Sequence, residues 1–223
     1  ELRVMASNVI DGAQEILFEA ISALQKEKIT EYIIIGGWCP YYRNDPQKTR
    51  LVHPGTRDVD ILFRQGYRSG SLKIIIQSLI DSDFIPSAKH PFQLLKTKPV
   101  GDKVLVYNID ILHPKMMEED KGMFIDHIDL DIPLVLKVPE TLKVKSIVLK
   151  SSDILFTDEL YTSFQINGLA FNLIDFTGMF ITKMDSFRKL KRERDSFDIY
   201  MAFKNEAVDF ELLSIYQSKN NNI

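Results

Sequence analysis

The chain has 223 residues, of which 45% are hydrophobic and 26% are charged, and its formal net charge is −3. This apolar content is that of one large or two small packed domains, and it excludes intrinsic disorder as the main state. With a net negative charge, the chain needs a local basic patch to bind nucleic acid.

Three further features bear on the cellular setting. No run approaches the roughly 18 consecutive apolar residues of a membrane span, so no membrane contact is expected. The single cysteine, Cys39, excludes an intrachain disulfide. The N-terminal residues lack the basic start and apolar block of a secretory signal. We therefore expect a cytoplasmic protein.

The N-terminal part alternates between helix and strand. Apolar residues spaced three and four apart predict a first helix over residues 11–26. The β-branched run 32–35 predicts a strand buried on both faces, and Gly36-Gly37 ends it. Prolines after the glycines limit any following helix to a short one. A second strand is predicted at residues 59–63 and a second helix over 72–80.

The pattern then changes to strands and finally to helices. The further strands are predicted at residues 92–96, 104–112, 144–149, 163–166 and 170–173. Asn167-Gly168 predicts a type I′ hairpin turn. From Asp175 onward the pattern is helical, in about three segments. The chain is therefore expected to be α/β or α+β, with a domain in residues 1–174 and a helical part in 175–223.

Two aspartates on one short strand are the first candidates for chemistry. Asp58 and Asp60 stand two apart, so their side chains point to the same face of the strand. Two buried like charges repel, and Mg²⁺, often held by one or two carboxylates plus substrate phosphates, compensates them directly. The alternative is a surface edge strand with both carboxylates in water.

Two other features strengthen the case for a site. Asp110 lies between β-branched neighbours at the end of an apolar strand. If this strand lies beside residues 59–63, Asp110 completes a three-carboxylate cluster that can hold two metal ions; otherwise it is an ordinary strand-end aspartate. Gly36 and Gly37 let the backbone turn sharply and bring its amides to an anion, with a helix N-terminus adding its dipole. Most such glycine pairs are plain turns.

The order of strand, Gly-Gly, Asp-x-Asp strand and third Asp strand resembles the nucleotidyltransferase superfamily related to DNA polymerase beta. The resemblance implies a mixed sheet flanked by helices, in which the three acids bind Mg²⁺ and the Gly36-Gly37 loop grips the phosphates of a nucleoside triphosphate. It also implies transfer of a nucleoside monophosphate to a hydroxyl. Two departures stand out: bulky Trp38 replaces a small residue, and residues 38–57 make a longer spacing than usual.

The C-terminal part narrows the resemblance. Lys183 interrupts an apolar helical stripe, so its ammonium either extends to solvent or reaches into a cleft. Asp195 and Asp198 share a helix face and can cap or pair with the basic run 188–194. This stretch is similar to the AbiEii-type nucleotidyltransferases, the toxins of type IV toxin–antitoxin pairs. The similarity implies that Lys183 contacts the triphosphate and that Asp195, and less directly Asp198, belongs to the active site.

The leading hypothesis is a Mg²⁺-dependent nucleotidyltransferase with one or two metal ions. Its candidate site residues are the catalytic and metal-binding Asp58, Asp60 and Asp110 and the nucleotide-binding Gly36, Gly37, Lys183 and Asp195. The acceptor is a tRNA end, a protein hydroxyl or a small molecule, with an antibiotic-modifying enzyme as the nearest competitor. An antitoxin is the partner that the toxin subgroup implies. The alternative is a nucleotide-binding sensor module without catalysis, which Trp38 and residues 38–57 favour.

Overall fold

The computed structural model describes residues 5–64, 69–114, 144, 146–149, 152–187 and 193–220. Its strands are β1 (Tyr32–Ile35), β2 (Asp58–Phe63), β3 (Ile85–Pro86), β4 (Gln93–Val100), β5 (Lys103–Pro114), β6 (Ile147–Leu149), β7 (Tyr161–Ile166) and β8 (Leu169–Ile174). Its helices are α1 (Ser7–Lys26), α2 (Trp38–Arg43), α3 (Pro46–Thr49), α4 (Ser69–Asp81), α5 (Asp153–Thr157), α6 (Phe176–Phe187), α7 (Glu193–Lys204) and α8 (Phe210–Asn220).

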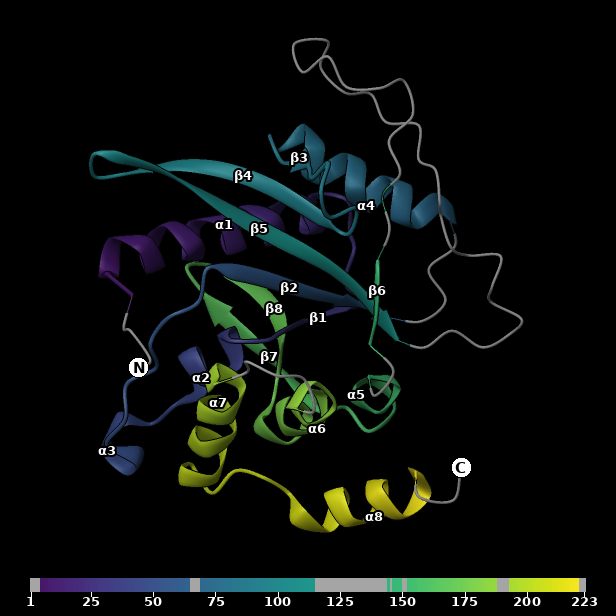
Figure 1. Ribbon diagram of the computed structural model, residues 1–223. Helices are drawn as coiled ribbons and strands as arrows, with labels where there is room; N and C mark the ends of the chain where they lie inside the picture. The colour runs from purple at the N-terminus through teal and green to yellow at the C-terminus, as the bar shows by residue number, and fades with distance from the viewer. Residues whose placement is uncertain are drawn as a thin grey trace.

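The strands form one mixed sheet, in the order β3-β4-β5-β2-β1-β8-β7, with β6 pairing with the end of β5. The central strand β1 is antiparallel to β2 and parallel to β8, and β2 is parallel to β5. Helices lie on both faces of the sheet (Figure 1). The predicted fold class, a mixed sheet flanked by helices with a helical C-terminal part, is therefore confirmed.

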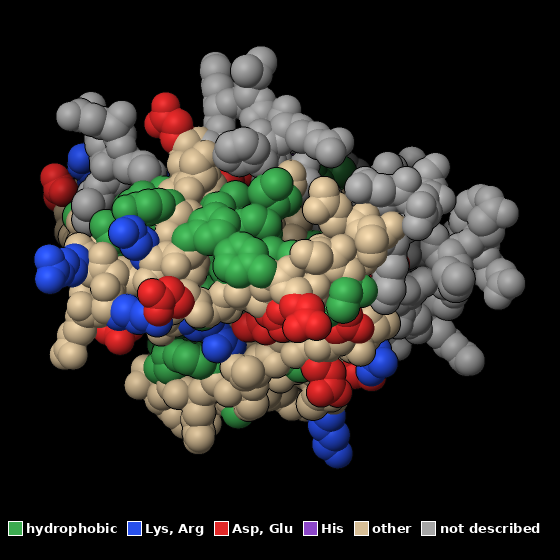
Figure 2. Space-filling model, turned by 90° about the horizontal axis from the view of Figure 1, so that it is seen from below, with side chains coloured by type: hydrophobic (Ala, Val, Ile, Leu, Met, Phe, Trp, Pro, Cys, Tyr) green, Lys and Arg blue, Asp and Glu red, His purple; other side chains and the backbone are tan. Residues whose placement is uncertain are grey.

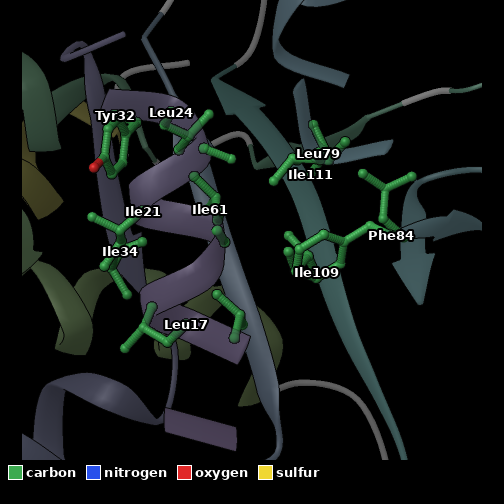
Figure 3. Close-up of a cluster of buried hydrophobic side chains, with 14 of the residues drawn as sticks. Leu17, Ile21, Leu24, Tyr32, Ile34, Ile61, Leu79, Phe84, Ile109 and Ile111 are labelled. Carbon is green, nitrogen blue, oxygen red and sulfur yellow. The ribbon is translucent and has the colours of Figure 1, made fainter. Parts of the chain in front are cut away.

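Successive residues of the central strands face two different apolar layers. On one face Ile34, Ile61 and Ile109 pack against α1 and α4, and the contacts of Ile34 and Ile61 with α1 are seen in Figure 3. On the other face Ile33 and Leu62 pack against α5, α6, α7 and the residues around them. This alternation explains the run of β-branched residues in β1, because both faces of that strand are covered.

Helix α1 begins at Ser7, four residues before the predicted start. The physical reason is tertiary, because the first turn packs on the rest of the fold. The Tyr107 hydroxyl donates to the carbonyl of Val9 at 3.0 Å, and Ile10 packs against Gly55. The predicted hairpin turn is confirmed, because Asn167 and Gly168 (φ 52° and 79°) connect β7 and β8. Gly101 and Asp102 connect β4 and β5.

Residues 38–57 form a structured connection rather than an open loop. They contain α2 and α3, and they contact α7 of the C-terminal part. The amide of Asp45 donates to Asn205 Oδ1 at 3.0 Å, and Lys48 Nζ donates to the Asn205 carbonyl at 2.7 Å. The long spacing between the glycines and the aspartates therefore ties the sheet to the C-terminal helices.

The C-terminal helices leave apolar side chains at the surface. Phe203 and Phe210 stack with ring centroids 5.6 Å apart and are 42% and 55% exposed. Figure 2, which looks onto the face that carries α8, shows hydrophobic side chains gathered there beside a band of acidic ones. In the part of the chain that the structure describes, no helix has the length and hydrophobicity to cross a bilayer.

Candidate active site

The register between β2 and β5 brings the three predicted aspartates to one face of the sheet. In this parallel pair Asp60 lies directly opposite Asp110, and Asp58 lies opposite Asn108. Residues two apart in a strand share a face, so all four side chains stand on the side covered by the C-terminal helices. The strand of Asp110 therefore does lie beside the Asp-x-Asp strand, which was the condition for Asp110 to join the other two acids.

Asp60 is the electrostatic centre of this group. Its pKa is raised from the ordinary 3.8 to about 7, first by burial and then by the negative charges of Asp110 and Asp58. The positive charges of Lys183 and Arg194 act in the opposite direction but do not offset the increase. Without an added cation, Asp60 is therefore about half protonated near neutral pH, whereas a bound cation would favour its charged form.

Asp110 is oriented by two side-chain amides. Its Oδ1 accepts hydrogen bonds from Gln93 Nε2 at 2.9 Å and from Asn108 Nδ2 at 2.8 Å. Burial raises the pKa of Asp110 above its ordinary value even though both amide donors lower it. Sequence reasoning did not assign these amides a role. The i, i+2 spacing of Asn108 was a usable signal, whereas Gln93 becomes a neighbour only through the β4–β5 register.

The two glycines lie directly against the acidic group and its basic neighbours. Gly36 has a φ of +73°, and a Cβ added there would collide with the Asp60 carboxylate. Gly37 has an ordinary φ of −68°, and a Cβ there would come 2.8 Å from Arg194 Nη2 and 3.0 Å from Thr56. Gly36 is therefore needed for the turn and for the close approach to Asp60, whereas Gly37 has an ordinary backbone conformation. The following helix α2 has only six residues, so its dipole adds little.

Trp38 is a core residue rather than a platform for a base. It is 0% exposed, and its indole Nε1 donates to the carbonyl of Asp58 at 2.9 Å. Its ring stacks on Tyr42 and meets Tyr41 edge-on, with centroids 5.4 and 5.6 Å away. Trp38 therefore anchors the connection after the glycines to the first residue of the Asp-x-Asp strand.

Replacing Trp38 with Phe is expected to lower the free energy of unfolding by about 1–3 kcal/mol, because the half-buried Asp58 carbonyl loses its indole donor while most packing remains. Denaturant unfolding monitored by circular dichroism measures this change. Tyr41→Phe is the control, since it removes a hydroxyl from the same cluster without removing a hydrogen bond to Asp58. Equal effects of the two substitutions would argue against the anchoring role.

Lys183 reaches inward rather than extending to solvent. It is 9% exposed, and its ammonium lies 2.8 Å from Asp195 Oδ1 and 2.6 Å from Asp198 Oδ2. Burial alone would lower the pKa of Lys183, but the two carboxylates raise it above the ordinary value, so the group stays charged. Its charge also lowers the pKa of Asp60. The structure thus places Asp195 and Asp198 in contact with Lys183, at the edge of the acidic group.

Two further residues, His53 and Arg194, lie near the cluster of Lys183, Asp195 and Asp198. His53 lies beside Asp198, with His53 Nε2 3.0 Å from Asp198 Oδ1, and Arg194 donates to the carbonyl of Gly55. His53 was assigned no role from the sequence, because its partner Asp198 is distant in the chain. Arg194 belongs to the predicted basic run, of which residues 188–192 lie outside the described residues.

The carboxylates on β2 are of the kind that would bind a metal ion together with a substrate. Among the described residues, no three His, Cys, Asp or Glu side chains come close enough together to form a metal cage of their own. Magnesium seldom uses such cages and is usually bound through one or two carboxylates together with substrate phosphates and water. Asp58 and Asp60, with their uncompensated negative charge, fit that type of site.

Comparisons with known proteins give structural neighbours of low similarity. No protein-family model matches the chain. No curated protein matches it either. An antigenic nucleotidyltransferase-like protein from Paracoccidioides brasiliensis matches over 85% of this chain and 73% of its own length, at 14% identity and a TM-score of 0.39. The antibiotic-resistance factor ANT(2″)-Ia matches over 93% and 95% of the two chains, at 12% identity and a TM-score of 0.42. The chain is thus similar to these two structures at the level of a mixed α/β arrangement alone.

Proposed function

We propose that this protein is a metal-dependent nucleotidyltransferase that transfers a nucleoside monophosphate from a nucleoside triphosphate to a hydroxyl group. The observation that carries the proposal is the β2–β5 register, which sets Asp60 opposite Asp110 beside Gly36. Carboxylates gathered on one partly covered sheet face, next to a closely approaching glycine turn and a buried lysine, suit the binding of a metal–triphosphate complex.

Each residue has a definite part in this proposal. Asp58 and Asp60 would hold Mg²⁺, which when bound would neutralise phosphate charge. Asp110, whose pKa burial raises above its ordinary value, would accept the proton of the acceptor hydroxyl. Gly36 gives the phosphates room at the acids, and the positive charge of Lys183 stabilises the leaving pyrophosphate.

A label-transfer assay tests the proposal. The protein is incubated with each of the four α-labelled nucleoside triphosphates and Mg²⁺, and with separate pools of RNA, protein and antibiotics as acceptors. We expect label on one acceptor class, and we expect chelation of the metal to abolish the transfer. Nucleotide binding without label on any acceptor would instead support the nucleotide-binding sensor.

The toxin subgroup is a narrower form of the same proposal. It is supported by the contact of Lys183 with Asp195 and Asp198, which are the residues of the AbiEii-like pattern. Induced expression in bacteria is expected to arrest growth, and co-expression of an antitoxin-like neighbouring gene is expected to restore it. Growth that is unaffected by an enzyme active in the transfer assay would exclude the toxin role and leave the transferase intact.

A further inference from the structure

A buried hydrogen-bond chain links the connection 38–57 to helix α7. His53 is 4% exposed and Asp198 is 0% exposed. His53 Nε2 lies 3.0 Å from Asp198 Oδ1, and the backbone amide of Gly55 donates to His53 Nδ1 at 3.2 Å. Because Nδ1 accepts an N–H, these bonds assign the imidazole proton to Nε2, from which it is donated to Asp198.

The two oxygens of Asp198 therefore bind different partners. Oδ1 accepts from His53, and Oδ2 lies 2.6 Å from the ammonium of Lys183. Burial alone would raise the pKa of Asp198, but the His53 hydrogen bond and the Lys183 charge lower it below its ordinary value, so the carboxylate stays ionised. Loss of the His53 donor would leave Asp198 Oδ1 buried without its hydrogen bond, and this cost favours a rearrangement of the carboxylate and of the ammonium that it shares with Asp195.

We propose that His53 is a positioning residue that acts through Asp198 to hold the Lys183 ammonium in its place beside the acidic group. The proposal rests on the proposed function, in which Lys183 binds the triphosphate. The charged groups around His53 are Asp198, Lys183 and Arg194, the last of which donates to the carbonyl of Gly55 in the same turn. His53 itself does not touch the acidic group.

The first test observes the lysine directly. An ordered, hydrogen-bonded ammonium gives a ¹H–¹⁵N resonance, which Lys183→Arg assigns by its disappearance. We expect this resonance to be lost in His53→Leu, which removes the donor to Asp198. We expect it to persist in His53→Gln, whose amide nitrogen can replace Nε2. Persistence of the resonance in His53→Leu would overturn the proposal.

The second test measures ligand binding with magnesium tripolyphosphate as the probe. His53→Leu is expected to weaken binding about 10- to 100-fold, as the loss of one well-placed charged hydrogen bond does, while His53→Gln recovers most of the affinity. If the wild-type protein does not bind this probe, the proposed function fails. The Lys183 resonance then still decides the role of His53.

Thr49→Val is the matched control for a merely structural effect. Thr49 is buried in the same connection, and its hydroxyl donates to the carbonyl of Asp45 at 2.9 Å without contacting Asp198. We expect this variant to be less stable but to keep the resonance and the affinity. Equal losses in Thr49→Val and His53→Leu would overturn the proposal. If His53→Leu does not fold, ¹⁵N spectra of the wild-type protein test the proposal by showing which imidazole nitrogen of His53 carries the proton. A proton on Nδ1 would overturn the proposal, because Nε2 must donate to Asp198.

Discussion

Replacing Asp60 with Asn is expected to abolish nucleotide transfer and at the same time to stabilise the protein. Transfer should fall on the order of 10³-fold, because in the proposed function Asp60 would be a charged ligand of the metal at the reacting phosphates. The metal-free variant should nevertheless unfold roughly 3–6 °C higher at pH 8, because it removes the cost of burying the Asp60 charge, which is the main cause of the raised pKa, and the repulsion by Asp110 and Asp58. Label transfer and thermal unfolding measure the two effects.

The stability difference has a definite pH dependence. The pKa of Asp60 is about 7 in the folded protein, against an ordinary 3.8, so the folded state binds the proton more tightly than the unfolded state. Proton binding by Asp60 therefore stabilises the folded wild-type protein at low pH. This stabilisation is lost as the pH rises from about 4 through 7, whereas Asp60→Asn has no such loss. The gap between the two melting temperatures should be small at pH 4 and largest at pH 8.

The control is Asp102→Asn, in the exposed turn between β4 and β5. It should change neither transfer nor the pH dependence of stability. Added Mg²⁺ should raise the melting temperature of the wild-type protein at pH 8 but not that of Asp60→Asn. A variant that is less stable than the wild type at every pH would contradict the assignment of uncompensated charge to Asp60.

Replacing Gly36 with Ala is expected to cost about 2–4 kcal/mol of unfolding free energy and to remove transfer. The residue has a φ of +73°, where an alanine is strained, and its Cβ would meet the Asp60 carboxylate. Relief of that contact would displace the Asp60 carboxylate from its position beside Gly36, so the remaining folded protein should also be inactive. Denaturant unfolding measures the loss of stability. Label transfer, assayed well below the midpoint temperature of unfolding, measures the loss of activity in protein that is still folded.

Two other glycines provide controls for this variant. Gly168 has a similar φ of +79°, but no atom within 4 Å of an added Cβ, so Gly168→Ala reports the backbone strain alone. Gly37 has an ordinary φ, and its added Cβ would meet the flexible end of Arg194. We expect Gly37→Ala to remain stable and to shift Arg194. If Gly36→Ala costs no more than Gly168→Ala, the close approach to Asp60 is not important.

Local sequence patterns predicted most of the elements and the strand with the two central acids, but they did not predict β3 or α5. The run in β1 has β-branched residues on both faces because both faces are covered, and Asp58 and Asp60 share a face because strands repeat every two residues. Helix α1 was predicted too short, since its first turn depends on Tyr107, which is distant in the sequence. Whether Lys183 extends to solvent or inward also could not be predicted, because helical spacing does not show what packs beside a residue.

The sequence by itself determined that strands carrying Asp58, Asp60 and Asp110 exist, and that a glycine pair precedes them. Only the tertiary structure decided that Asp60 lies opposite Asp110, because strand register depends on pairing between distant segments. It also decided that the connection 38–57 carries His53 to Asp198, 145 residues later in the chain. Short-range periodicity specifies the face of a strand or helix on which a residue lies. The residues that it contacts across the fold are decided by long-range packing, and the candidate site depends on such contacts.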